Sequence, residues 1–164
     1  MARILSRILM TAEGRAKLEA ELDCLLKERH VLIDLISVAR GHGDLSENAE
    51  YHSARERQSF VEGRIQELEN MKSLSEVVEE SNLRGDTIKF GATVKLLEVE
   101  ESSSNRSVLQ YKIVSEYEAD VSQGLLSINS PLASALIGKK KDEYAEVKTP
   151  KGEKLYQVIG LEFK

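Results

Sequence analysis

The sequence predicts an α+β protein: an N-terminal antiparallel α-helical coiled-coil hairpin, followed by a small antiparallel β domain with one short helix. Three observations support this fold class. Both prolines, Pro131 and Pro150, fall late in the chain. The first 130 residues therefore contain no proline that would interrupt a helix. In the first half, apolar residues recur at alternating spacings of three and four, as in a coiled coil. From Asp86 onwards, β-branched residues alternate with polar ones, as in strands.

The first helix is expected to begin after Thr11, whose hydroxyl can cap it, and to stop at Gly41 and Gly43. Between these points one position in every three or four is apolar, which is the seam of a coiled coil. Arg29 interrupts this seam, and we expect it to lower stability while helping to fix the register. The seam positions are Leu18, Leu22, Leu25, Arg29, Leu32, Ile36 and Ala39.

The second helix repeats the pattern and then shifts it. Folding the chain about residues 44–47 brings the two seams together as an antiparallel hairpin, whose arms of about 30 residues would each be roughly 45 Å long. The expected pairs are Ile36 with Ala54, Leu32 with Gln58, Leu25 with Ile65, and Leu22 with Leu68. The second seam comprises Tyr51, Ala54, Gln58, Val61, Ile65 and Leu68, after which it slips to Met71, Leu74 and Val78.

The predicted domains are the coiled-coil hairpin at residues 1–80, a linker at 81–84 and the β domain at 85–164. A short helix is expected at Pro131–Ile137, because proline is favoured in a first turn and Gly138 can end the helix. Hairpin loops are expected at residues 102–105 and 150–152. Strands are expected at residues 86–99, 108–114, 125–128, 144–148 and 155–163.

Composition and charge exclude several classes of protein. The single cysteine, Cys24, excludes an intramolecular disulfide and a thiolate zinc cluster. The apolar run at residues 4–10 is short and interrupted by arginine, so we expect no signal peptide, no membrane partner and a cytoplasmic location. With a net charge of −5, we expect any contact with nucleic acid to be indirect or confined to a few arginines. We expect a monomer.

Two carboxylates, Asp44 and Glu47, stand three residues apart in the turn between the helices. One interpretation is a capping box, in which each side chain accepts a hydrogen bond from the backbone of the other at a helix start. The other is a pair of oxygen ligands for Mg²⁺, a cation that takes one or two protein carboxylates and keeps several waters. Such a site would be incomplete without a second macromolecule. The spacing alone leaves both interpretations open.

Two segments carry a resemblance to a known family. Residues 43–56, Gly-Asp-Leu-Ser-Glu-Asn-Ala-Glu-Tyr-His-Ser-Ala-Arg-Glu, closely resemble the tip motif of the bacterial GreA/GreB transcript-cleavage factors. Residues 127–138, Ser-Ile-Asn-Ser-Pro-Leu-Ala-Ser-Ala-Leu-Ile-Gly, resemble their second signature. The resemblance implies a coiled coil that enters the secondary channel of RNA polymerase and an FKBP-like domain that docks at the channel mouth. The acidic balance is most like the GreA branch.

The resemblance also implies roles for individual residues. Asp44 and Glu47 match the two catalytic carboxylates, which would hold a Mg²⁺ jointly with the polymerase and not bind it tightly in the free protein. They would stimulate cleavage of the 3′ end of backtracked RNA and so rescue arrested complexes. The chain would therefore be an accessory factor and not itself an enzyme. Arg40 and Arg55 match basic positions near the tip, either as contacts to RNA phosphates or as surface ion-pair partners.

The remaining matches concern shape and docking. Gly43, Asn48 and Tyr51 are expected to shape the tip. Ser130 and Pro131, in the second signature, are expected to dock on the polymerase. One departure from the family is that an acidic residue usually stands where this chain has Gly41, which predicts a looser turn with one negative charge fewer.

Three other functions remain open from the sequence. The first is an inhibitory paralog that occupies the channel without promoting cleavage. The second is a prolyl isomerase, which the FKBP-like fold suggests although fold does not imply function. The third is a coiled-coil adaptor, which would not require this tip sequence.

Overall fold

The computed structural model describes residues 7–43, 48–79, 83–99 and 107–163. Contacts divide the chain into two compact units. The first contains Arg15–Ser75, and the second contains Ile8–Gly14 together with the chain from Glu76 onwards. The predicted fold class, a helical hairpin followed by a β domain, is confirmed. The linker at 81–84 stays a prediction, because residues 80–82 lie outside the described residues.

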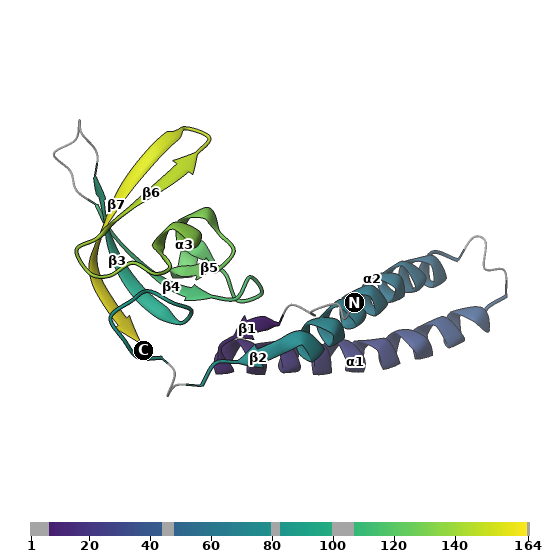
Figure 1. The fold of residues 1–164 in the computed structure, drawn as a ribbon. Coiled ribbons are helices and arrows are strands. Elements are labelled where there is room, and N and C mark those ends of the chain that lie inside the picture. Colours follow the sequence, from purple (N-terminus) through teal and green to yellow (C-terminus); the bar gives the residue numbers. More distant parts are fainter. Residues whose placement is uncertain (1–6, 44–47, 80–82, 100–106, 164) are drawn as a thin grey trace, which may run out of the picture. The chain divides into compact units, whose positions relative to one another are not determined.

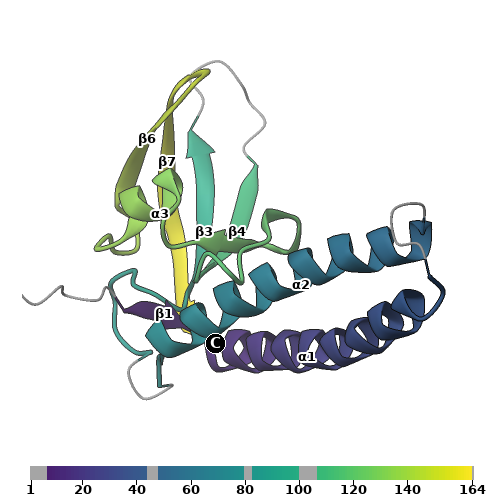
Figure 2. The same cartoon turned by 90° about the vertical axis from the view of Figure 1, so that its right-hand side faces the viewer.

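The hairpin consists of α1 (Ala12–Arg40) and α2 (Ala49–Leu74), which run antiparallel side by side (Figures 1 and 2). The predicted seam is confirmed in both helices. Its apolar members up to Leu68 are buried, apart from Tyr51. Arg29, Tyr51 and Gln58 are half-buried, as their polar groups require. The hairpin is therefore held by a single apolar stripe on each helix.

Ion pairs across the hairpin flank this seam and fix the antiparallel register. Arg57 of α2 donates two hydrogen bonds to the Glu28 carboxylate of α1, at 2.6 and 3.0 Å. Nearer the base, Arg64 pairs with Glu21 at 2.9 Å. Arg29, which interrupts the seam, pairs with a carboxylate of α2 at 3.6 Å. Its charge is therefore compensated within the hairpin.

Replacing Glu28 with glutamine is expected to reduce the loss of hairpin stability in acid. The hydrogen bonds from Arg57 lower the pKa of Glu28 in the folded chain. The carboxylate therefore stabilises the fold above its unfolded pKa, and this contribution is lost as the pH falls through the folded pKa. Between about pH 7 and pH 3, the melting temperature should fall further in the wild type than in Glu28→Gln, by a small margin because solvent screens the pair.

The control for this measurement is Glu69→Gln, at an exposed position of α2. It should lose melting temperature as the wild type does. An identical acid-induced fall in Glu28→Gln and the wild type would contradict the prediction.

The base of the hairpin differs from the prediction. The helix α2 ends at Leu74, and the next residues form β2 (Ser75–Val77), which pairs with β1 (Ile8–Met10). Val78, predicted to continue the helical seam, instead donates its backbone N–H to the Met10 carbonyl at 3.0 Å. Neither strand was predicted, because three residues are too few to show a period of two.

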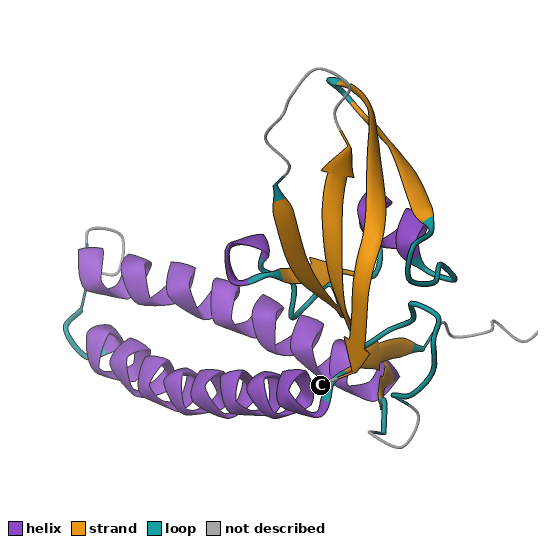
Figure 3. Ribbon diagram, turned by 90° about the vertical axis from the view of Figure 1, so that its left-hand side faces the viewer, coloured by secondary structure: helices purple, strands orange, loops and turns teal. Residues whose placement is uncertain are grey.

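The second unit contains a five-stranded sheet of order β5-β4-β3-β7-β6 (Figure 3). Three of its pairings are antiparallel, but β4 and β5 run parallel, so the predicted all-antiparallel sheet is corrected to a mixed one. Strand direction depends on how the chain crosses over between β4 and β5, which local patterns do not show. The strands are β3 (Ala92–Val99), β4 (Val108–Val114), β5 (Leu125–Ser127), β6 (Tyr144–Thr149) and β7 (Gly152–Phe163).

Four strand boundaries differ from the prediction, those at the ends of β5 and β6 by only one residue. The chain before β3 is irregular, because Gly91 adopts a positive φ of 85° and its N–H donates to the Ile113 carbonyl at 2.8 Å. A turn at this glycine delays the strand, which had been predicted from Asp86. β7 begins earlier than predicted, at Gly152, because β6 and β7 form a tight hairpin over residues 150–151. The predicted loop at 102–105 lies outside the described residues.

The predicted short helix is confirmed to within one residue as α3 (Pro131–Leu136). It packs against the sheet, where its buried Ala133 and Leu136 join the apolar face. No helix among the described residues is apolar over a length sufficient to cross a membrane. The buried core of this unit consists of Ile88, Ala92, Val94, Leu96, Ile113, Leu126, Ala133, Leu136, Ala145, Val147, Tyr156 and Val158.

Candidate functional site at the hairpin tip

The first arm ends in a glycine-bearing turn. Beyond Arg40, the N–H of Gly41 donates to the Val38 carbonyl at 3.0 Å, and the N–H of His42 donates to the Ala39 carbonyl at 3.2 Å. Gly43 follows with a φ of +102°, in the region that favours glycine. These bonds satisfy carbonyls that a helix end would otherwise leave unpaired. A side chain at Gly43 would strain the backbone of this turn.

The second arm begins at an asparagine with two partners. The Oδ1 atom of Asn48 accepts a hydrogen bond from the Tyr51 N–H at 3.1 Å, which caps α2. Its Nδ2 atom donates to the Ala39 carbonyl at 3.2 Å. One side chain therefore caps the second helix and ties it to the end of the first. The sequence placed Asn48 among the tip residues, but its double role depends on the neighbouring arm and was not predicted.

The Asn48 cap bears on one of the two interpretations of the carboxylates, the capping box. A capping box would require α2 to start directly after Asp44, but α2 starts at Ala49, with Asn48 as its cap. The capping box is therefore wrong for this helix. Asp44 and Glu47 themselves lie outside the described residues.

Small buried residues lie in the seam next to the tip. Ala39, the last seam residue of α1, and Ala54, the second seam residue of α2, are 3% and 8% exposed. Tyr51, three residues before Ala54, is half-buried. Its ring meets that of His52 edge-on, with centroids 5.5 Å apart. Alanines at this level allow the two helices to approach closely, which the bond from Asn48 to the opposite arm requires.

Replacing Asn48 with alanine is expected to destabilise the tip by about 2 kcal/mol, since one helix cap and one interhelical hydrogen bond are lost. The measurement is hydrogen exchange at the Tyr51 amide, which should speed up, together with thermal melting. Asn48→Asp is the matched control, because it retains an acceptor for the Tyr51 N–H but cannot donate to Ala39. It should lie between the wild type and Asn48→Ala, and wild-type exchange in the alanine variant would refute the role.

The two candidate RNA-contacting arginines lie on different arms. Arg40 is the last residue of α1, and Arg55 lies in the second turn of α2; both are exposed. The Arg55 guanidinium donates to Oε1 of Gln58 at 3.1 Å, and this neutral amide leaves the charge uncompensated in that contact. The surface ion-pair interpretation and the phosphate interpretation both stay predictions.

The predicted docking residues build the start of α3. The Ser130 hydroxyl donates to the Ser127 carbonyl at 2.7 Å and accepts from the Ala133 N–H at 3.2 Å, and Pro131 occupies the first turn. Both residues thus have a local structural role in the second unit. Their predicted contact with the polymerase is not tested by these bonds.

One polar cluster in the second unit was missed from the sequence. Glu118 is only 8% exposed, and its carboxylate accepts hydrogen bonds from the backbone and hydroxyl of Thr11 and from those of Ser115. Thr11 caps α1 as predicted, accepting from the Gly14 N–H at 3.0 Å. The carboxylate thus lies at the positive end of α1's dipole. The Ser115-x-x-Glu118 spacing is a local signal for part of this cluster, but the contact with Thr11, 107 residues away, has none.

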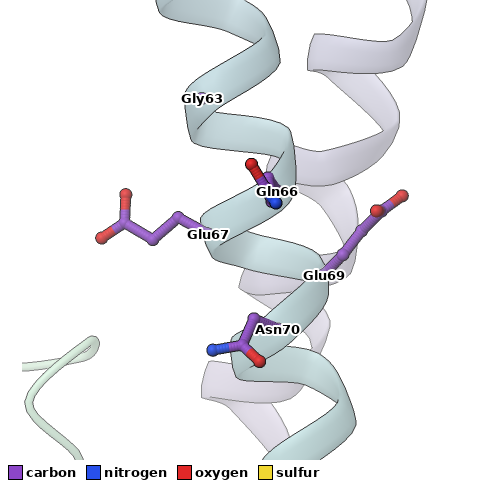
Figure 4. A pocket seen from close by; sticks show the side chains of 5 residues that line it. All are labelled: Gly63, Gln66, Glu67, Glu69 and Asn70. Carbon is purple, nitrogen blue, oxygen red and sulfur yellow. The ribbon is translucent and has the colours of Figure 1, made fainter.

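The described residues contain no group of three or more His, Cys, Asp or Glu side chains placed to hold a metal ion. A shallow depression of about 660 Å³ lies elsewhere on the hairpin, lined by residues that all come from α2 (Figure 4). Its lining is polar, with two carboxylates and two amides around Gly63. It does not include any of the predicted site residues.

Comparisons with known proteins agree with this architecture. The family model described as "Transcription elongation factor, N-terminal" matches residues 8–77, and "Transcription elongation factor, GreA/GreB, C-term" matches residues 83–163. The chain is 52% identical to transcription elongation factor GreA of Rhodospirillum rubrum, with 97% of this chain and 99% of the relative covered. It is 50% identical to GreA of Hyphomonas neptunium, with 98% and 100% covered.

Among solved structures, the GreA factor homolog 1 protein of Thermus thermophilus is 24% identical, with 95% of this chain and 99% of that chain covered and a TM-score of 0.44. The two family models between them span nearly all of the described chain, in the order hairpin and then sheet. The chain therefore belongs to the GreA/GreB family of transcription elongation factors.

Proposed function

We propose that this transcription elongation factor inserts its hairpin into the secondary channel of bacterial RNA polymerase and stimulates Mg²⁺-dependent cleavage of backtracked RNA. Asp44 and Glu47 would be the carboxylates that reach the polymerase active site. The observation that carries the proposal is the closed end of the hairpin, where Asn48 of the second arm is bonded to Ala39 of the first.

This closure limits where the carboxylates can be. Asp44 directly follows Gly43, and Glu47 directly precedes Asn48. A residue adds at most about 3.6 Å to the reach of a chain, so neither carboxylate can withdraw far along the arms. Since Asn48 already caps α2, the acids are not needed for that role. They would then be available for a cation supplied from outside.

The chemistry of the pair suits Mg²⁺. This ion binds through one or two carboxylates and keeps its remaining positions for waters and phosphate oxygens. When bound beside a phosphodiester, it supplies a water of lowered pKa and neutralises developing charge. Asp44 and Glu47 would help hold the ion and orient that water, while the polymerase supplies the other ligands. The chain would thus act as an accessory and not as an enzyme by itself.

The other predicted residues complete the proposal. Arg40 and Arg55 would contact phosphates of the extruded RNA, because a guanidinium binds phosphate oxygens in a bidentate geometry. Gly43 and Tyr51 would keep the tip narrow. Ser130 and Pro131, at the start of α3, would belong to the surface that docks at the channel mouth. The protein would act as a cytoplasmic monomer and would bind Mg²⁺ only weakly when free.

The experiment mixes the full chain with a stalled, backtracked bacterial polymerase complex and Mg²⁺, and measures short RNA fragments released from the 3′ end. Fragments should accumulate faster than without the protein, and elongation should resume when nucleotides are added. An inhibitory paralog would bind the complex and slow transcription without releasing fragments. That result would overturn the cleavage proposal while preserving channel binding.

A further inference from the structure

The part of α1 nearest the tip carries three exposed aliphatic side chains on one face. Val31, Leu35 and Val38 are spaced four and three residues apart, so they share one face of the helix. They are 57%, 52% and 62% exposed. None belongs to the seam, which lies one position further along the chain in each case. We call these three residues the α1 row.

Charge is depleted around the α1 row. Nine of the residues from Glu13 to Arg29 are Asp, Glu, Lys or Arg, but residues 30–39 include only Asp34. A helix face that stays in water is usually charged or polar. The base of α1 follows this rule and the stretch next to the tip does not. On α1, the large apolar side chains that are exposed are therefore confined to the stretch next to the tip.

The composition of the α1 row restricts what can cover it. Nucleic acid is bound through Lys and Arg, and the row has neither. Helices that bind membrane surfaces carry many basic residues, whereas this chain has a net charge of −5. A stable dimer buries roughly 800 Å² on each partner, far more than three aliphatic side chains provide. What remains is a small apolar contact that adds to a larger protein interface.

We propose that the α1 row packs against an apolar protein surface of RNA polymerase when the hairpin is inserted. This inference rests on the proposed function. Val38 is two residues from Arg40 and six from Asp44, so a protein wall that encloses the tip also faces the row. The contact lowers the free energy of the inserted state and leaves the cleavage chemistry itself unchanged.

The test compares Leu35→Ser/Val38→Ser with the wild type in the cleavage assay, as full chains at increasing concentration. The half-saturating concentration should rise about tenfold or more, because two aliphatic side chains lose an apolar contact. The cleavage rate at saturation should stay within about twofold of the wild type. Thermal melting should be unchanged, since the replaced side chains are exposed in the free protein.

A matched control is available on the same helix. Ile33 is 48% exposed, close to the value for Leu35, but it is two residues away and faces the other side of α1. Ile33→Ser should leave the half-saturating concentration unchanged, whereas Leu35→Ser alone should raise it. Equal effects of the two single variants would show that only general hydrophobicity matters and would overturn the proposal.

Two further results would overturn it. One is wild-type half-saturation by Leu35→Ser/Val38→Ser. The other is a wild-type dimer in sedimentation that this variant converts to a monomer, since the row would then bind a second copy of the chain. If the wild type releases no fragments, the proposed function fails instead. In that case, competition binding of the variant to polymerase still tests the row.

Discussion

Asp44→Asn is expected to lower the rate of factor-stimulated RNA cleavage by about tenfold to a hundredfold. The replacement keeps the shape of the side chain but removes the negative charge that would help hold Mg²⁺. An interaction with a charged group contributes about 1.5–3 kcal/mol, and each 1.4 kcal/mol is a factor of ten in rate. Glu47→Gln should have a comparable effect. The double variant should approach the rate without factor, because neither side chain would then carry the charge proposed to help hold the ion.

The same experiment has a second measurement, the Mg²⁺ concentration that gives half-maximal cleavage. It should rise in Asp44→Asn, because a weakened site requires more of the ion to fill. Binding to the polymerase, measured by competition, should be unchanged. The control is Glu56→Gln, which removes an exposed carboxylate from the same motif and should cleave normally. Full-rate cleavage by the double variant would refute the assignment of both carboxylates.

The hairpin could be predicted from the sequence because its determinants are local and repeated. Every predicted apolar seam position up to Leu68 is buried except Tyr51, because a stripe at spacings of three and four marks one face of a helix. Prediction failed where the pattern was short or the partner was distant. β1 and β2 have three residues each, and the parallel pairing of β4 with β5 depends on the path of the chain.

Some residues of the candidate site could likewise be predicted from the sequence, and others could not. Gly43 could be assigned to the turn from the sequence because glycine commonly ends a helix, and in the structure it has a φ of +102°. Asp44 was a wrong prediction for the cap of α2, because Asp44 and Asn48 are both good caps and spacing alone does not choose between them. Asn48 also donates to the Ala39 carbonyl of the other arm, a contact that spacing along the sequence does not show. Glu118 was missed because a single glutamate has no sequence pattern that marks it as buried.

Gly14→Ala is expected to destabilise the second unit, although alanine favours helix over glycine by about 1 kcal/mol. A Cβ atom at Gly14 would overlap the carboxyl group of Glu118. That group is buried and held by Thr11 and Ser115, so it cannot move aside without breaking their hydrogen bonds. Losing them leaves buried donors unpaired, at a cost of about 1–3 kcal/mol each. The net effect should be roughly 2 kcal/mol, seen as a lower melting temperature.

The steric explanation makes a sharper prediction in a double-mutant cycle. Glu118→Ala alone should cost roughly 3 kcal/mol, because it removes the hydrogen bonds and the negative charge at the start of α1. Once the carboxylate is gone, Gly14→Ala has nothing to displace, and only the helix preference of alanine remains. The same substitution should then stabilise the protein by up to about 1 kcal/mol. If Gly14→Ala destabilised both backgrounds equally, the cause would lie in the backbone of α1 and not in its contact with Glu118.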